Sequence, residues 1–196
     1  KMDINAFEIN FSDVEIQNVK TKVASFPWHE MPKDGGWSFG TNIDYMKNLA
    51  DYWTKEYDWK SQEARLNQFP NYKTKVDDLD IHFIIKKSSS PKAIPLILIH
   101  GWPGSIVEFL EIIDPLCEPE KYGNNNEVCF DIIAPSIPGF AFSGKPENPI
   151  GPRRIASIFN KLMTEKLGYK KYVAQGGDWG SAISTWLGFD HSKNCK

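Results

Sequence analysis

The sequence predicts an α/β protein in which buried β-strands alternate with α-helices after a helical N-terminal region. Residues 94–100 form a continuous apolar run, as a strand covered on both faces requires, and residues 130–134 form a second such run. Segments with apolar residues at helical spacing lie between these runs and after the further strand expected at residues 172–175. Strands separated by helices favour right-handed crossovers and a mostly parallel, doubly wound sheet.

The composition is that of a globular protein, with 196 residues, 41% hydrophobic and 24% charged. A net charge of −2 gives no electrostatic reason to expect nucleic acid or an anionic membrane as partner. Three widely spaced cysteines, Cys117, Cys129 and Cys195, argue against a disulfide scaffold and for a reducing compartment. Neither a CxxC pair nor a His/Cys cluster suggests zinc, so no metal site is expected.

The first part of the chain, residues 1–90, is expected to hold three helices and a β-hairpin. Ser12 and Glu15 match a capping box for the first helix, and the pair Phe26-Pro27 ends it. Thr41 or Asn42 is expected to cap a second helix. One face of that helix carries Tyr45, Leu49, Tyr52 and Trp53, and a short helical turn follows at residues 61–67.

The hairpin is expected at residues 72–76 and 79–85, with Asp77-Asp78 as its turn. In its second strand Ile81, Phe83 and Ile85 alternate with His82 and Ile84, which predicts two different faces.

The second part, residues 91–196, carries the alternating strands and helices. Helices are expected at residues 105–117, 153–167 and 179–189, with a polar loop at residues 121–127. Gly168 is expected to end the second of these helices as a C-cap.

The segment from Tyr172 to Gly180 predicts a nucleophile elbow, G-x-S-x-G, in which Asp178 replaces serine. Such a turn brings the flanking backbones into contact, which explains glycine at positions 176 and 180, and Gly177 belongs to the same tight turn. Asp178 would lie at a helix N-terminus, where the helix dipole favours its anion. A simpler interpretation, that Asp178 only caps this helix, is open for GGDWG taken alone.

Aspartate in place of serine has a chemical meaning. A serine that attacks an alkyl carbon leaves an ether, whereas a carboxylate leaves an ester that activated water can hydrolyse. The elbow therefore predicts substrates attacked at sp³ carbon, which are epoxides or haloalkanes.

The residues that follow the strand at 94–100 support this interpretation. His100-Gly101-Trp102-Pro103 lies where α/β-hydrolases place a loop that donates one backbone N–H to the oxyanion hole, and the residue after the nucleophile donates the other. The expected donors are the amides of Trp102 and Trp179. A plain β-turn would explain the glycine and proline of this loop equally well.

With these motifs in view, the sequence resembles the microsomal and juvenile-hormone type of epoxide hydrolase. The matching stretches are Trp37-Ser38-Phe39-Gly40, Tyr57-Asp58-Trp59, residues 62–69 (QEARLNQF), residues 100–105 with Glu108-Phe109, residues 135–140 (PSIPGF) and residues 175–181.

The resemblance implies an α/β-hydrolase fold with an N-terminal meander, of which the first five strands lie in this chain and the cap and C-terminal half do not. It implies cofactor-independent opening of a small lipophilic epoxide by water to a vicinal diol, in detoxification of foreign compounds. It also implies that Asp178 is the nucleophile, that Trp102 and Trp179 supply the oxyanion hole, and that His100 shapes the loop. The catalytic base and the tyrosines that polarise the epoxide would lie beyond residue 196.

The four histidines in the chain offer no convincing base. His191 ends the helix that starts beside Asp178, roughly 15–20 Å along its axis. His82 and His29 are as easily explained as surface polar residues. Two other functions therefore stay open: a haloalkane dehalogenase, and an inactive fragment that binds lipophilic ligands or partners.

Membrane-bound members of this family carry an N-terminal anchor before the matching region. No run here approaches the ~20 apolar residues of a membrane span, so a cytoplasmic protein is the expectation. Because the chain opens with Lys1, the endoplasmic reticulum membrane is the alternative if an upstream anchor was removed. No oligomeric state is predicted.

Overall fold

The computed structural model describes residues 3–32, 35–124 and 128–196. They form two compact units, Ile9–Arg65 and a larger one that combines Lys1–Glu8 with Leu66–Lys196. The predicted boundary at residue 90 falls inside the larger unit, between its β-hairpin and its next strand. In the described part of the chain, no helix is both long and apolar enough to cross a membrane.

The smaller unit is helical, with α1 at Asp13–Ala24, α2 at Ile43–Lys55 and α3 starting at Trp59 and ending at Asn67. The capping box at Ser12 and Glu15 is confirmed, since each side chain bonds the other's backbone N–H. Asn42, rather than Thr41, caps α2 by accepting from the Tyr45 amide at 3.0 Å. The third helix starts two residues earlier than predicted, and Asp58 accepts from the Ser61 amide within its first turn.

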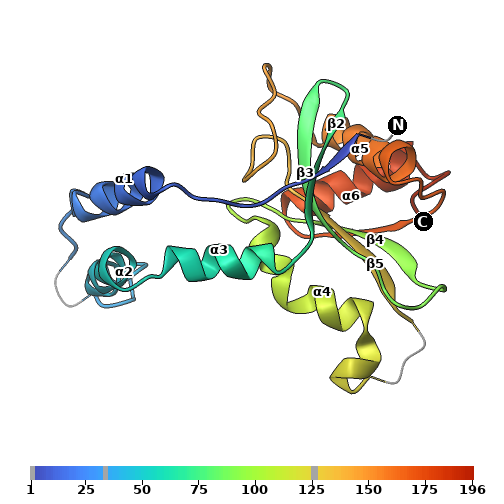
Figure 1. Ribbon diagram of the computed structural model, residues 1–196. Coiled ribbons are helices and arrows are strands. Elements are labelled where there is room, and N and C mark those ends of the chain that lie inside the picture. The colour runs from blue at the N-terminus through green and yellow to red at the C-terminus, as the bar shows by residue number, and fades with distance from the viewer. Residues whose placement is uncertain (1–2, 33–34, 125–127) are drawn as a thin grey trace. The chain divides into compact units, whose positions relative to one another are not determined.

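The larger unit is built on one six-stranded sheet in the order β1-β2-β3-β5-β4-β6 (Figure 1). The strands are β1 (Ile4–Ala6), β2 (Asn71–Val76), β3 (Leu79–Lys86), β4 (Ile94–Ile99), β5 (Phe130–Pro135) and β6 (Val173–Gly176). The five strands predicted from the sequence are confirmed, and β1 is an additional one.

The expectation of a mostly parallel sheet is corrected. The β4–β5 and β4–β6 pairings are parallel, whereas β1–β2, β2–β3 and β3–β5 are antiparallel. The tight hairpin turn reverses the chain between β2 and β3, so these two strands must run in opposite directions. Parallel pairing appears only where a helix carries the chain back across the sheet.

Helices cover both faces of this sheet, which explains the unbroken apolar runs of β4 and β5. Ile97 and Ile99 pack with α5 (Pro152–Lys161) and α6 (Trp179–Asp190) in the main core. Leu96 and Leu98 alternate to the other face, where α4 (Leu110–Cys117) lies (Figure 1).

Two predicted helices change type along their length. A 3₁₀ turn at Ile106–Phe109 precedes α4, and a π-helical turn at Leu162–Lys166 continues α5. Gly168 ends the latter with φ +77°, the left-handed conformation expected of a C-cap.

β6 lies at one edge of the sheet, and the turn that follows it contains Asp178. Just before it, Tyr172 pairs in parallel with Cys195: the Tyr172 amide donates to the Asn194 carbonyl, and the Lys196 amide donates to the Tyr172 carbonyl, both at 3.0 Å. The last residues of the chain thus cover the start of this edge.

Candidate active site

The turn between β6 and α6 has the conformation of a nucleophile elbow. Asp178 occupies it with φ 52° and ψ −125°, a strained conformation for a residue with a side chain. It stands in the N-cap position of α6, yet its side chain makes no capping hydrogen bond. A helix cap alone therefore does not account for Asp178, because its exposed carboxylate also accepts from another segment of the chain.

Two glycines make this turn possible. A Cβ on Gly176 would lie 2.5 Å from the carbonyl carbon of Gly180, and a Cβ on Gly180 would lie 2.0 Å from the Ile99 carbonyl oxygen. Real Cβ atoms do not approach so closely, so both positions need glycine. Gly177 differs, because a Cβ there would have no atom within 4 Å, and the turn places no such steric demand on it.

The loop after β4 supplies the partner of the carboxylate. The Trp102 amide donates to Asp178 Oδ1 at 2.8 Å, across 76 residues of sequence. Pro103 follows Trp102 through a cis peptide bond. A Cβ on Gly101 would lie 2.6 Å from the Asp178 Cβ, so glycine is required here for the two segments to approach.

The buried ring of His100 holds this loop in place through hydrogen bonds. Its side chain is fully buried, its Nε2 accepts from the Ile137 amide at 3.0 Å, and its Nδ1 lies 3.0 Å from the Gly101 carbonyl oxygen. These partners require a neutral ring with its proton on Nδ1, and burial also lowers the pKa of His100. The expectation that His100 shapes the loop agrees with this arrangement.

Glu108 is a further contributor that sequence reasoning did not assign. Its Oε1 accepts from the Gly101 amide at 3.4 Å, from the first turn after the loop. A Cβ on Gly104 would lie 2.1 Å from the same oxygen, so Gly104 leaves room for this carboxylate. The sequence feature that could have indicated this role is the acidic residue four positions after Gly104.

Hydrogen bonding keeps the Asp178 carboxylate charged. The Trp102 amide is the main cause that lowers its pKa below the ordinary value, and the Trp179 amide acts in the same direction. Each donor stabilises the anion and not the acid. The two amides predicted as oxyanion donors thus both act on the carboxylate predicted as nucleophile.

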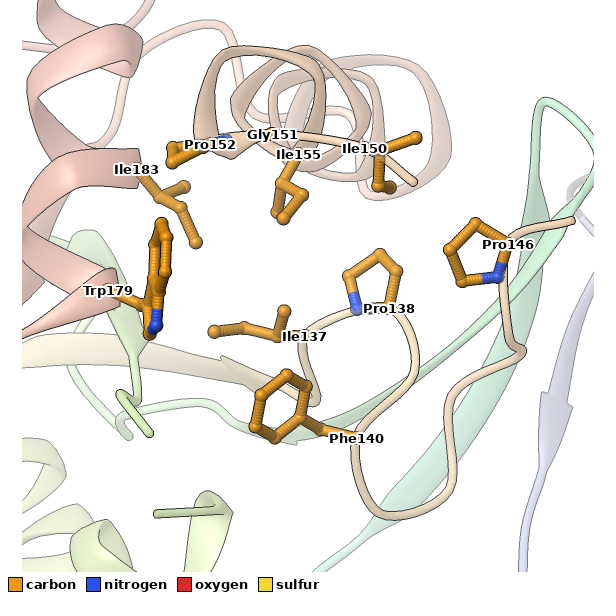
Figure 2. A pocket seen from close by; sticks show the side chains of 10 residues that line it. All are labelled: Ile137, Pro138, Phe140, Pro146, Ile150, Gly151, Pro152, Ile155, Trp179 and Ile183. Atoms are coloured by element: carbon orange, nitrogen blue, oxygen red, sulfur yellow. The ribbon is translucent and has the colours of Figure 1, made fainter. Parts of the chain in front are cut away.

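An apolar cavity of about 280 Å³ lies beside the elbow (Figure 2). Trp179 and Ile183 of α6 form one side of it, and Pro146 lies on the opposite side. Its other lining residues are Ile137, Pro138, Phe140, Ile150, Gly151, Pro152 and Ile155. No sequence pattern indicated this cavity, because its lining residues come from separate segments between residues 137 and 183.

The structure corrects the interpretation of His82 as surface polar. His82 is fully buried, with Nδ1 2.8 Å from Ser136 Oγ and Nε2 2.8 Å from Asn71 Oδ1. Burial is the main cause that lowers its pKa to about 3. His191 follows the last residue of α6, at the opposite end from Asp178, and His29 is exposed in the helical unit.

A mixed sheet flanked by helices, with a strained acidic elbow facing backbone amides, defines the α/β-hydrolase class. The family models agree: residues 94–196 match the model described as alpha/beta hydrolase fold, and residues 4–109 match Epoxide hydrolase N terminus.

Individual relatives point the same way. Juvenile hormone epoxide hydrolase 1 of Ctenocephalides felis is 41% identical over 187 residues, which is 93% of this chain and 39% of that protein. Epoxide hydrolase 1 of Sus scrofa is 39% identical over 93% of this chain and 41% of its own length. The crystal structure of juvenile hormone epoxide hydrolase from Bombyx mori covers 100% of this chain and 46% of its own, with TM-score 0.89 and 35% identity.

The chain belongs to the epoxide hydrolase family. It spans about two-fifths of the length of the curated relatives that it matches.

Proposed function

We propose that Asp178 is the nucleophile of an epoxide hydrolase and that it opens the epoxide ring at carbon. The observation that carries the proposal is the 2.8 Å hydrogen bond that Asp178 Oδ1 accepts from the Trp102 amide, which joins the turn before α6 to the loop after β4. A carboxylate held as its anion at an exposed turn is a competent nucleophile without a cofactor.

In the first step, Asp178 Oδ2 forms a bond to one epoxide carbon while the bond from that carbon to the ring oxygen breaks. The ring oxygen leaves as an alkoxide, which takes up a proton from water, and the product is an aspartyl alkyl ester with a neighbouring hydroxyl group. In the second step, a base takes a proton from water, the water oxygen forms a bond to the ester carbonyl carbon, and negative charge develops on Oδ1. The bond from that carbon to Oδ2 then breaks, so that the diol leaves with Oδ2 and the carboxylate is restored. The amides of Trp102 and Trp179 would stabilise that charge, by about 3–4 kcal/mol for each well-placed donor.

The second step needs a base, and we propose that the 196-residue chain alone is alkylated but does not turn over. Both ring nitrogens of His82 and of His100 are already engaged in hydrogen bonds. His191 follows the last residue of α6, at the opposite end of that helix from Asp178. His29 belongs to the separate helical unit. For the protein as a whole, the named relatives support hydrolysis of lipophilic epoxides to diols.

The test is covalent labelling with a small epoxide, such as styrene oxide, on this chain and on any longer gene product that contains it. Intact mass should show one adduct, peptide mapping should place it on Asp178, and hydroxylamine should release it as an ester. Asp178→Asn should abolish the adduct. Asp190→Asn, at the other end of the same helix, is the matched control and should retain it.

Labelling that persists in Asp178→Asn would refute the assignment. A haloalkane of matched size that alkylates Asp178 faster than the epoxide, with release of halide, would favour a dehalogenase instead. Multiple turnovers by the 196-residue chain would contradict the proposal that it lacks a base.

A further inference from the structure

The segment that follows β5 is held against β3 by Ser136, whose polar groups all lead to His82. The Ser136 amide donates to the His82 carbonyl at 2.9 Å, and the Ser136 hydroxyl lies 2.8 Å from His82 Nδ1. The Ser136 carbonyl accepts from Ser143 Oγ at 2.7 Å, and the same Oγ accepts from the His82 amide at 3.0 Å. All three residues are buried, and hydrogen bonds are stronger in such an environment than in water. Residue 136 is therefore fixed to the sheet.

The peptide unit between Ser136 and Ile137 passes this constraint on. Its C=O accepts from Ser143, and its N–H donates to Nε2 of the buried His100 ring at 3.0 Å. A peptide unit is planar and nearly rigid, so a donor that fixes the C=O also fixes the direction of the N–H. The Ser143 hydroxyl thus helps to place the hydrogen bond that holds the His100 ring.

A second peptide unit, between Gly101 and Trp102, completes the path to the elbow. Its C=O accepts from His100 Nδ1 at 3.0 Å, and its N–H donates to Asp178 Oδ1 at 2.8 Å. His100 connects the two peptide units as a neutral ring with its proton on Nδ1, which is the form that its partners require. The amide that contacts the carboxylate is thus tied to β3 through a buried ring and a buried hydroxyl.

The five hydrogen bonds from the His82 amide to Asp178 all point in one direction. In each of them the donor lies nearer to His82 along the path, and the acceptor lies nearer to Asp178. Aligned hydrogen bonds polarise one another and become stronger, by roughly 10–30% for each bond. The last acceptor is an anion, and hydrogen bonds to ionised groups are the stronger ones. We name this path, which runs through Ser143 Oγ and His100, the Ser143 relay.

We propose that Ser143 is a positioning residue for the reaction at Asp178, because its hydroxyl orients and polarises the Trp102 N–H through the relay. The catalytic meaning of this inference rests on the proposed function. A stronger donor stabilises the Asp178 carboxylate, and it also stabilises the oxyanion that forms on Oδ1 when the ester is cleaved. The Trp102 amide is the main cause that lowers the pKa of Asp178, so a weaker donor at this place should raise that pKa.

The hydroxyl of Ser136 belongs to a different branch of the same cluster. Asn71 Nδ2 donates to two backbone carbonyls, so Asn71 Oδ1 is the atom that faces His82 Nε2 and accepts its proton. The neutral His82 ring must then accept from the Ser136 hydroxyl at Nδ1. These hydrogen bonds point away from Asp178. Ser136→Ala therefore removes a buried hydroxyl without interrupting the relay.

The first experiment measures the relay by NMR, on the native chain and on three variants. Ser143→Ala removes the relay hydroxyl, so the Trp102 amide proton should move upfield, and the pKa of Asp178, read from its carboxyl carbon, should rise. Ser143→Thr keeps a hydroxyl and should retain the native values. Ser136→Ala is the matched control and should leave both values unchanged. If Ser143→Ala does not fold, Ser143→Cys fills the same space with a weaker donor, and it should shift both values in the same direction.

The second experiment measures what the relay does for catalysis, by cleaving the Asp178 ester of the labelled protein with hydroxylamine under native conditions. The hydroxylamine nitrogen bonds to the ester carbonyl carbon, charge develops on Oδ1, and the diol leaves with Oδ2, so no protein base is needed. Release from Ser143→Ala should be about two- to eightfold slower than from the native chain. This range is roughly 10–30% of the logarithm of the 10²- to 10³-fold effect of one oxyanion donor. Ser136→Ala should release the diol at the native rate.

The two readouts separate the relay from the proposed function. An unchanged Trp102 proton and Asp178 pKa in folded Ser143→Ala, or equal shifts in Ser136→Ala, would overturn the relay. A native rate of release from Ser143→Ala would overturn its role in the reaction. Absence of any Asp178 adduct would instead refute the proposed function, while the NMR comparison would still decide whether the relay exists.

Discussion

The elbow region and the helical unit Ile9–Arg65 are built in contrasting ways. Around Asp178, an ideal Cβ would lie less than 3 Å from another atom at positions 101, 176 and 180, which makes glycine obligatory there. In the helical unit, α1 and α2 contain no buried residue, and large side chains such as Trp37 and Tyr45 are more than half exposed. One region is specified by contacts within the chain, whereas the other presents apolar surface that its own unit does not cover.

The largest expected effect tests the crowding at the elbow. Gly180→Ala would drive a Cβ into the Ile99 carbonyl, and we expect it to lower the free energy of unfolding by at least about 3 kcal/mol, the upper range for overpacking. Gly188→Ala is the matched control on the same helix, where a Cβ meets nothing within 4 Å. It should raise stability by about 0.5–1 kcal/mol, because alanine has less freedom to lose than glycine. Urea denaturation would measure the free energy of unfolding of both variants. Equal changes in the two would contradict the claim that the elbow is specially crowded.

A second prediction uses pH to compare the buried sheet with the exposed helices. Below pH 6.5 the unfolded chain binds a proton on His82 that the folded chain does not bind until about pH 3. The free energy of unfolding should therefore fall as pH drops through this window, with His82 contributing up to ~1.4 kcal/mol per pH unit. His82→Gln should flatten the dependence of the free energy of unfolding on pH. It should also lower that free energy by a constant amount at every pH, because the hydrogen bonds to Ser136 and Asn71 are disturbed.

His29→Gln changes an exposed histidine of the helical unit and is the control for that slope. Denaturant melts at several pH values between 4 and 7 would compare the three proteins. A His82→Gln slope as steep as that of the native chain would show that the buried ring is not what titrates.

The smallest effect is expected in the helical unit. Tyr45→Ser and Leu49→Ser alter side chains that are 52% and 42% exposed, so each should change the free energy of unfolding by less than about 0.5 kcal/mol. The same change at Leu187, which is fully buried in α6, should cost several times more. Sedimentation should show less self-association for the Tyr45 and Leu49 variants, since exposed apolar surface favours association. Losses comparable to Leu187→Ser would place these residues in a core.

Prediction from the sequence succeeded best where a short motif is compatible with only one local structure. A strand, a Gly-x-Asp-x-Gly turn and a helix fix the elbow, and the residues that would touch Asp178 follow from that turn and from the loop after β4. The prediction failed where partners are distant in sequence: the His82 partners, Asn71 and Ser136, lie 11 and 54 residues away. β1 was missed because three mostly exposed residues carry no periodic signal.

The placement of the thiols would have a chemical consequence if Asp178 reacts with epoxides as proposed. Cys117, Cys129 and Cys195 are all buried, and burial raises the pKa of Cys117 to about 11. Thiolates are stronger nucleophiles than carboxylates, and an accessible one would be consumed by the same reagents. With these sulfur atoms shielded by burial, the proposed oxygen nucleophile at position 178 would react first, which would protect the chain from alkylation at its thiols.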